Sequence, residues 1–156
     1  MKAIFLDIDG VLNLYCESRD EYGCCFHDHL VENLRRVIEQ TGAKIVISST
    51  WRFSGLEIMK EMWEKRSLPG EVAGITPNFM TRYGTTLCRG KEIAAYLEEH
   101  PDIESYVIID DDSDMEEHQM DRFVKTSGNK DHEDCVDAGY GLTSRCADMA
   151  IEILNR

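Results

Sequence analysis

The sequence predicts a three-layer α/β/α fold with a mainly parallel sheet. Short apolar runs suit strands that are buried on both faces, and they alternate along the chain with amphipathic helical patterns. No internal repeat, low-complexity tract or linker interrupts this order. The length of 156 residues fits one domain, so we expect residues 1–156 to fold as a single unit.

The first strand is predicted at residues 2–6, where the chain is almost entirely apolar. Residues 12–26 are polar and aromatic, which is typical of a flap or loop. A helix should follow, with Asp28 as its N-cap and Gly42 as the residue that ends it. Its apolar positions recur at helical spacing, at Leu30, Leu34, Val37 and Ile38.

The middle of the chain predicts a second buried strand at residues 44–50. Ser54 then offers an N-cap for a helix at residues 55–66. The stretch 69–88 contains at most two short strands. Two tryptophans are expected to pack in the core, Trp51 and Trp63.

The last third of the chain predicts two helices and two strands. Residues 90–100 form the first of these helices, and residues 106–110 form a third buried strand. Residues 122–126 predict a fourth, short strand. The chain ends in a helix at residues 143–156, with Thr143 as its cap.

Each of the three clearest strands runs into polar residues at its carboxyl end. The carboxyl ends of parallel strands meet at one edge of a sheet, where ligands bind in open α/β folds. The polar residues are Asp7, Asp9, Ser48, Ser49, Thr50, Asp110, Asp111 and Asp112. Clustered carboxylates repel one another unless they are protonated or bind a cation. Because oxygen ligands suit Mg²⁺, the pattern predicts a magnesium site.

The spacing of Asp7 and Asp9 indicates chemistry in addition to metal binding. Residues two apart in a strand point to the same face, and Gly10 allows a sharp turn after them. One carboxylate could attack phosphorus and form an aspartyl-phosphate, while the other carries a proton to and from the leaving oxygen. Lys91 and Ser48 could donate hydrogen bonds to the phosphoryl oxygens.

Four short motifs resemble those of the haloacid dehalogenase (HAD) superfamily of phosphatases. They are FLDIDGVLN, the serine of IVISS, the lysine of RGKEI, and VIIDDDSD, in the order of the family's own motifs. The resemblance implies a Rossmann-like HAD fold and an Mg²⁺-dependent phosphatase. Asp7 matches the nucleophile, and Asp9 matches the general acid/base, whose backbone carbonyl also binds the metal. Asp110 matches the direct metal ligand, and either Asp111 or Asp114 matches the outer residue of the metal site.

The family's phosphate-binding pair is matched by Lys91 and Ser48, with Ser49 as the alternative serine. The motifs LDIDGVLN, SSTWR, RGKEI and IIDDDSDM and a late GLT also resemble the small phosphatase domains of RNA-repair enzymes and polynucleotide kinase-phosphatases. That resemblance implies a terminal phosphate of a nucleic acid as the substrate. It also implies that Arg52 contacts this phosphate.

The lengths of two segments between the motifs indicate which sizes of substrate the site could admit. Residues 12–28 hold only a flap, and residues 53–89 hold about one helix, so neither connection is large enough for a cap domain. A site without a cap would be open to the end of a polymer. Four arginines would form a basic rim if they converged, Arg19, Arg52, Arg82 and Arg89. The alternatives are a phosphatase of nucleotides or small metabolites, and a non-catalytic module that binds phosphate or metal.

The composition limits the partners. A formal net charge of −13 opposes indiscriminate binding to nucleic acid, although a local basic patch or a bound cation would still allow a specific contact. No apolar run is long enough to span a membrane, and the N-terminus reaches Asp7 too soon for a signal peptide. We therefore expect a cytoplasmic protein without a membrane partner. No signature of a stable protein partner is present.

The sequence contains six cysteines. Without an export signal, disulfides are not expected. A cluster of thiols and imidazoles could indicate zinc, at Cys16, Cys24, Cys25, His27 and His29. Its spacing lacks the paired C-x-x-C form, so we interpret these cysteines as loop and core thiols and leave the role of the cluster open.

Overall fold

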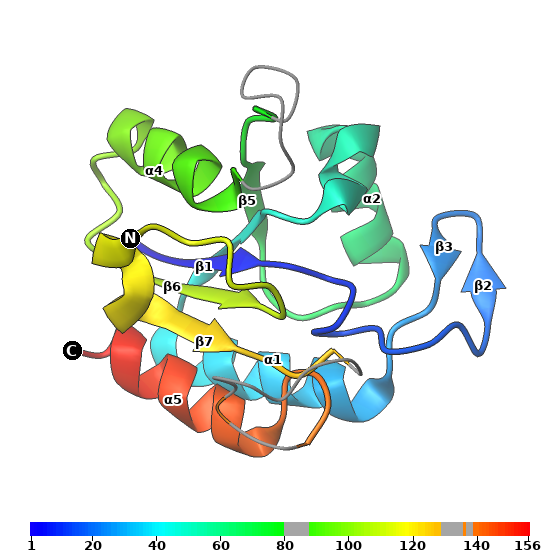
Figure 1. The fold of residues 1–156 in the computed structure, drawn as a ribbon. Helices are drawn as coiled ribbons and strands as arrows, with labels where there is room; N and C mark the ends of the chain where they lie inside the picture. The colour runs from blue at the N-terminus through cyan, green and yellow to red at the C-terminus, as the bar shows by residue number, and fades with distance from the viewer. Residues whose placement is uncertain (80–87, 129–135, 137–138) are drawn as a thin grey trace.

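The computed structural model describes residues 1–79, 88–128, 136 and 139–156. Five parallel strands form one sheet in the order β5-β4-β1-β6-β7 (Figure 1). The strands are β1 (Lys2–Leu6), β4 (Lys44–Ile47), β5 (Val72–Ile75), β6 (Ser105–Asp110) and β7 (Phe123–Lys125). The predicted parallel sheet is confirmed, and the short strand expected at residues 122–126 is the edge strand β7.

Helices cover both faces of the sheet, which makes the three layers. They are α1 (Asp28–Thr41), α2 (Leu56–Lys65), α4 (Arg89–Glu99) and α5 (Ser144–Leu154). Helices α1 and α5 lie together on one face, and α4 lies on the other (Figure 1). Side chains of β1 alternate between the two cores. Ile4 and Leu6 pack in the core with α1, α2 and α5, whereas Phe5 packs in the core with α4.

The ends of the helices agree only in part with the sequence patterns. Gly42 ends α1 in the left-handed conformation, and the Thr143 hydroxyl caps α5, as predicted. Asp28 and Ser54 were wrong as N-caps, because the capping positions of α1 and α2 are His27, where the chain is extended, and Gly55, which has a φ of +96°. Asp28 is instead the first residue of its helix, and Ser54 ends the short helix η1 (Thr50–Ser54).

The carboxyl edge of the sheet is not covered by a cap domain in the part of the chain that the structure describes. The connection after β1 carries only a small antiparallel hairpin, of β2 (Arg19–Asp20) and β3 (Gly23–Cys24). This hairpin projects beside α2, apart from the main sheet (Figure 1). Of the predicted stretch 69–88, residues 80–87 lie outside the described residues, and β5 is the strand found in the rest. No described helix is long and apolar enough to cross a bilayer.

A disulfide joins Cys16 to Cys24, so the expectation that disulfides are absent was wrong. That expectation rested on the compartment, whereas the hairpin brings the two Cα atoms to 5.2 Å, within the range that a disulfide requires. The bond also removes both sulfurs from any zinc site. The cluster that could hold a metal among the described residues consists of carboxylates instead.

An ion pair anchors the hairpin to the end of α2. Arg66 donates to both carboxylate oxygens of Asp20, at 2.6 and 2.8 Å, and to the carbonyls of Gly23 and Cys24. The hydrogen bonds from Arg66 lower the pKa of Asp20 to about 2. The carboxylate of Asp20 therefore favours the folded state at neutral pH.

We expect Asp20→Asn to lower the thermal midpoint at neutral pH by an amount that shrinks in acid. The stabilisation by a carboxylate of lowered pKa is fully present above its unfolded pKa of about 3.9 and is lost as the pH falls through the folded value. Thermal midpoints of both proteins should be measured between about pH 7 and pH 2. A difference that stays constant over this range would contradict the role of the ion pair.

Candidate active site

The carboxyl ends of β1 and β6 bring three aspartates together. Asp7 directly follows β1, and its N–H donates to the carbonyl of Ile109 at 3.0 Å, so the chain stays paired to β6 at this level. Asp110 is the last residue of β6. Carboxylate oxygens of Asp7, Asp110 and Asp111 all lie within 4.8 Å of one another. The predicted convergence of strand ends is therefore present in the structure.

Burial and mutual repulsion perturb these three groups. Burial raises the pKa of Asp7 to about 6, and Asp111 adds to this effect while Arg89 opposes it. Burial, and then the charge of Asp7, raise the pKa of the fully buried Asp110. Burial also raises the pKa of Asp111. Positive charge at this point would therefore return the three carboxyls to their ionised form.

Arg89 is a cation that contacts this cluster. One guanidinium nitrogen lies 2.7 Å from Asp110 Oδ2 and 3.2 Å from Asp7 Oδ1. Burial lowers the pKa of Arg89, but Asp110 and Asp7 raise it to a net value above the ordinary one, so the side chain stays charged.

The structure does not bring Lys91 to the carboxylates, in contrast to the prediction. Its Nζ lies 3.1 Å from Glu116 Oε1, and about half of the side chain is exposed. Helix α4 begins at Arg89, and residues two apart on a helix do not share a face. Once Arg89 faces the sheet edge, Lys91 points elsewhere.

The two serines after β4 have different environments. Ser49 caps η1 by accepting a hydrogen bond from the N–H of Trp51 at 3.2 Å. Ser48 is buried, and its hydroxyl has no hydrogen-bond partner within the described parts of the chain. A buried hydroxyl without a partner requires an explanation, and a bound ligand would provide one. Of the two serines left open by the sequence, the geometry favours Ser48 as the phosphate donor.

Asp9 lies at the open side of the cluster. Its side chain is exposed, and each of its oxygens accepts one hydrogen bond, Oδ1 from Asn13 and Oδ2 from Trp51. Gly10 follows with φ of +84°, and a Cβ at this position would collide with the carboxylate of Asp111. A glycine is thus required both for the turn and for the close approach of Asp111.

Comparison with protein families identifies a match over most of the chain. The model of the HAD domain in Swiss Army Knife RNA repair proteins matches residues 3–131. The chain belongs to this family. The resemblance to HAD phosphatases and to RNA-repair domains is thereby confirmed. Searches among curated proteins and among solved structures gave no significant match.

In this HAD domain, Asp111 and Asp114 have distinct positions. Asp111 is part of the carboxylate cluster. Asp114 instead caps α4, because its Oδ2 accepts from the N–H of Arg89 and its carbonyl accepts from the N–H of Gly90, both at 2.9 Å. The alternative that Asp114 is the outer metal residue is therefore not supported by the geometry.

Arg52 is a structural residue of the HAD domain, not an exposed contact for substrate. The side chain is 3% exposed and lies 2.9 Å from Glu92. Its remaining hydrogen bonds go to four backbone carbonyls, those of Ser48, Ser49, Thr76 and Pro77. The guanidinium thus makes five hydrogen bonds, as many as it has donors, and this geometry does not support the predicted role in substrate binding.

We expect Arg52→Met to reduce the free energy of unfolding by about 3–5 kcal/mol, because Glu92 would be left as a buried, unpaired charge. Arg36→Met is a matched control, since Arg36 lies 2.6 Å from Asp148 but the two side chains are 31% and 67% exposed. The Arg36→Met variant should lose less than about 1 kcal/mol of its free energy of unfolding. Denaturant unfolding of the two variants measures the difference, and equal losses would contradict the structural role of Arg52.

Three residues of the site were assigned no role there by the sequence patterns, or only a vague one. Arg89 entered only as one of four arginines that could form a rim, and Arg82 of that set lies outside the described residues. Trp51 was expected to be a core residue. It packs against the core but is only half buried, and its indole N–H reaches Asp9, whereas Trp63 is buried as predicted. Asn13 is the last residue of the motif FLDIDGVLN, but no role was assigned to it.

Proposed function

We propose that this HAD domain is an Mg²⁺-dependent phosphomonoesterase that forms an aspartyl-phosphate on Asp7 and acts on terminal phosphates of nucleic acids. The observation that carries the proposal is the contact of Arg89 with both Asp7 and Asp110 inside a cluster of three carboxylates. A nucleophile, a fixed cation and oxygen ligands for a metal then lie at one point.

The donor set fits Mg²⁺. All three side chains offer oxygen, and burial raises their pKa values, so a bound cation would favour their ionised forms. Asp7, Asp110 and Asp111 would hold the ion, together with the backbone carbonyl of Asp9 that the family resemblance implies. When bound, Mg²⁺ supplies positive charge that stabilises the oxygens of the transferring phosphoryl group.

The side chains of the site can carry out both halves of the reaction. A carboxylate oxygen of Asp7 attacks phosphorus in line, and the bond from phosphorus to the leaving oxygen breaks while Asp9 donates a proton to that oxygen. Asp9 then takes a proton from a water molecule, whose oxygen attacks phosphorus, releases phosphate and regenerates Asp7. Arg89 and the hydroxyl of Ser48 donate to the phosphoryl oxygens.

Three features favour the end of a nucleic acid as the substrate. The family occurs in RNA repair proteins. The described residues include no cap domain over the site, so a polymer end has access. An open cavity of about 460 Å³ lies beside Asp9, lined by Asn13, Tyr15, Cys16 and Asp111 among others, which is large enough for a nucleotide-sized group. A cytoplasmic location is part of this proposal.

A panel of substrates with Mg²⁺ tests the proposal. It should contain an aryl phosphate, nucleotides, and oligonucleotides that carry a 3′- or a 5′-phosphate. Preference for one type of oligonucleotide end is the expected result. Activity on nucleotides or small metabolites alone would contradict the proposal that the substrate is a nucleic-acid end. If no substrate released phosphate in an Mg²⁺-dependent way, the non-catalytic alternative would be favoured.

A further inference from the structure

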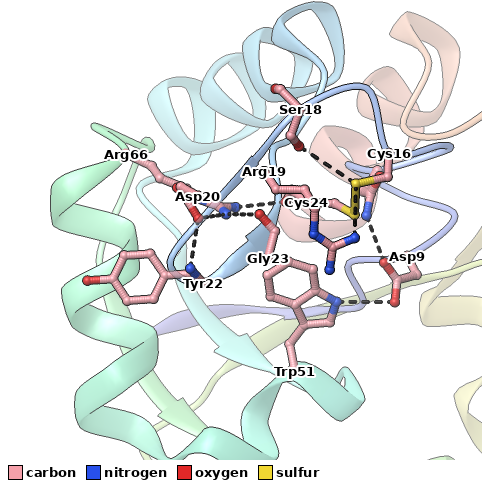
Figure 2. Close-up of a disulfide and its surroundings, with 11 residues drawn as sticks. Asp9, Cys16, Ser18, Arg19, Asp20, Tyr22, Gly23, Cys24, Trp51 and Arg66 are labelled. Carbon is pink, nitrogen blue, oxygen red and sulfur yellow. Dashed lines mark hydrogen bonds and ion pairs between the residues drawn. A yellow bond between two sulfur atoms is a disulfide. The ribbon is translucent and has the colours of Figure 1, made fainter.

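Both oxygens of the Asp9 carboxylate are held by neutral donors. Asn13 Nδ2 lies 3.0 Å from Oδ1, and Trp51 Nε1 lies 3.1 Å from Oδ2. Figure 2 shows the indole N–H pointing at Asp9. An exposed aspartate without such partners would sample several rotamers. A group that transfers protons must instead stay within hydrogen-bond reach of the reacting oxygen.

An indole is well suited to hold a proton-transfer group. Its N–H only donates, so Trp51 has no acceptor that could draw the proton of Asp9 away from the leaving oxygen. The same hydrogen bond persists whether Asp9 is charged or neutral, because either form keeps a free lone pair on Oδ2. Trp51 can therefore fix the carboxyl group in both halves of the reaction.

The hairpin of β2 and β3 packs on Trp51. A Cβ at Gly23 would lie 3.2 Å from Cη2 of the indole, which shows how closely the hairpin backbone approaches the ring. Phe26 meets the ring at a centroid distance of 5.5 Å, edge to face, and the guanidinium of Arg66 lies 5.7 Å from its centroid. The position of the indole thus depends on the segment that follows the first strand.

Covalent and ionic bonds fix this hairpin. The disulfide between Cys16 and Cys24 closes it, and Arg66 ties Asp20 and Gly23 to the end of α2 (Figure 2). The contacts form a continuous chain from the disulfide through Gly23 and Trp51 to Asp9.

We propose that Trp51 is a positioning residue that orients Asp9 for proton transfer, and that the hairpin closed by Cys16–Cys24 holds Trp51 in place. The proposal rests on the proposed phosphatase function and extends it to the hairpin and to Trp51, which lies in the motif SSTWR but had no role assigned by the resemblance. Its kinetic signature depends on the leaving group, because an aryl oxide leaves without a proton whereas an alkoxide needs one.

The kinetic test compares Trp51→Phe with the wild type on two substrates, an alkyl phosphate and an aryl phosphate. Phenylalanine keeps an aromatic ring against Phe26 and removes the N–H donor. We expect kcat/KM, which reports the steps up to departure of the leaving group, to fall about 10-fold for the alkyl phosphate and to change by less than about 2-fold for the aryl phosphate. Equal losses on both substrates, or no loss on either, would overturn the positioning role.

A second measurement does not depend on turnover. The chain has two tryptophans, so a ¹H–¹⁵N spectrum shows two indole N–H signals. Asp9→Ala should move the signal of Trp51 and leave that of Trp63, whose N–H donates to the carbonyl of Pro69 at 2.8 Å. An unmoved Trp51 signal would refute the contact, even if the protein proved not to be a phosphatase. A moved signal without any phosphatase activity would instead refute the proposed function alone.

The role of the hairpin is tested with Cys24→Ser, which removes the disulfide but keeps every donor to Asp9. The expected result is a fall of about 3-fold in kcat/KM for the alkyl phosphate, with kcat/KM for the aryl phosphate unchanged. Cys25→Ser is the matched control, because Cys25 is the neighbouring free thiol and should leave both rates unchanged. Wild-type rates on both substrates in Cys24→Ser would show that closure of the hairpin by the disulfide does not hold Trp51 in place.

Discussion

Replacing Asp7 with asparagine should abolish the release of phosphate, lowering the rate by at least about 10³-fold. The amide has no carboxylate oxygen with which to attack phosphorus. The fold should persist, because asparagine has the same shape and removes one of three clustered negative charges. The rate of phosphate release should be measured with Mg²⁺, and the thermal midpoint without it, for the variant and the wild type. The midpoint of the variant should equal or exceed that of the wild type.

Two further aspartate variants make this result specific. Asp111→Asn removes a carboxylate from the cluster and should also lower activity, whereas Asp114→Asn should retain activity within about 3-fold because asparagine also caps helices well. Near-wild-type, Mg²⁺-dependent turnover by Asp7→Asn would contradict covalent catalysis by this residue. Equal effects at positions 111 and 114 would contradict the assignment of the metal site.

Replacing Arg89 with methionine should lower the rate by at least about 10²-fold, since it removes the fixed cation beside the nucleophile. Stability without Mg²⁺ should also fall, by about 3–5 kcal/mol, because the fully buried Asp110 would lose its partner. Added Mg²⁺ should restore part of this stability by replacing the lost positive charge. Phosphate release and denaturant unfolding, with and without Mg²⁺, measure these effects.

Lys91→Met is the matched control for Arg89→Met. Lys91 is two residues away in the same helix, pairs with Glu116 at 3.1 Å and is half exposed, so its loss should change the rate by less than about 3-fold. If instead Lys91→Met were the inactive variant and Arg89→Met the active one, the assignment from the sequence motif would be right, and the assignment from the contacts in the structure would be wrong.

The sheet and the meeting of its acidic strand ends could be predicted because they follow from short-range rules. A run such as residues 106–110, apolar at every position before its aspartate, has few options other than a strand covered on both faces. The carboxyl ends of such strands then share one edge of the sheet. Asp7 and Asp110 were placed correctly for this reason alone.

The cationic partners could not be predicted in the same way. Whether Arg89 or Lys91 faces the carboxylates depends on where α4 starts, to within a single residue, and boundaries are the least certain part of a sequence-based prediction. The burial of Arg52 depends on Glu92, a partner 40 positions along the chain. No local pattern shows such a pairing.

The hairpin illustrates a different limit. The expected cytoplasmic location argued against a disulfide, but the turn between β2 and β3 places Cys16 and Cys24 close together regardless of compartment. The link from Trp51 to Asp9 likewise spans 42 positions and requires the hairpin to be in place. Tertiary contacts of this kind carry no periodic signal in the sequence.

The most direct measurement is the detection of phosphate on Asp7. A substrate labelled with ³²P should be mixed with protein and Mg²⁺, quenched in acid and mapped by peptide digestion. In Asp9→Ala with an aryl phosphate, the slow second step should let the label accumulate on the peptide that contains residue 7. Turnover without label at Asp7, in both the wild type and this variant, would contradict the aspartyl-phosphate pathway.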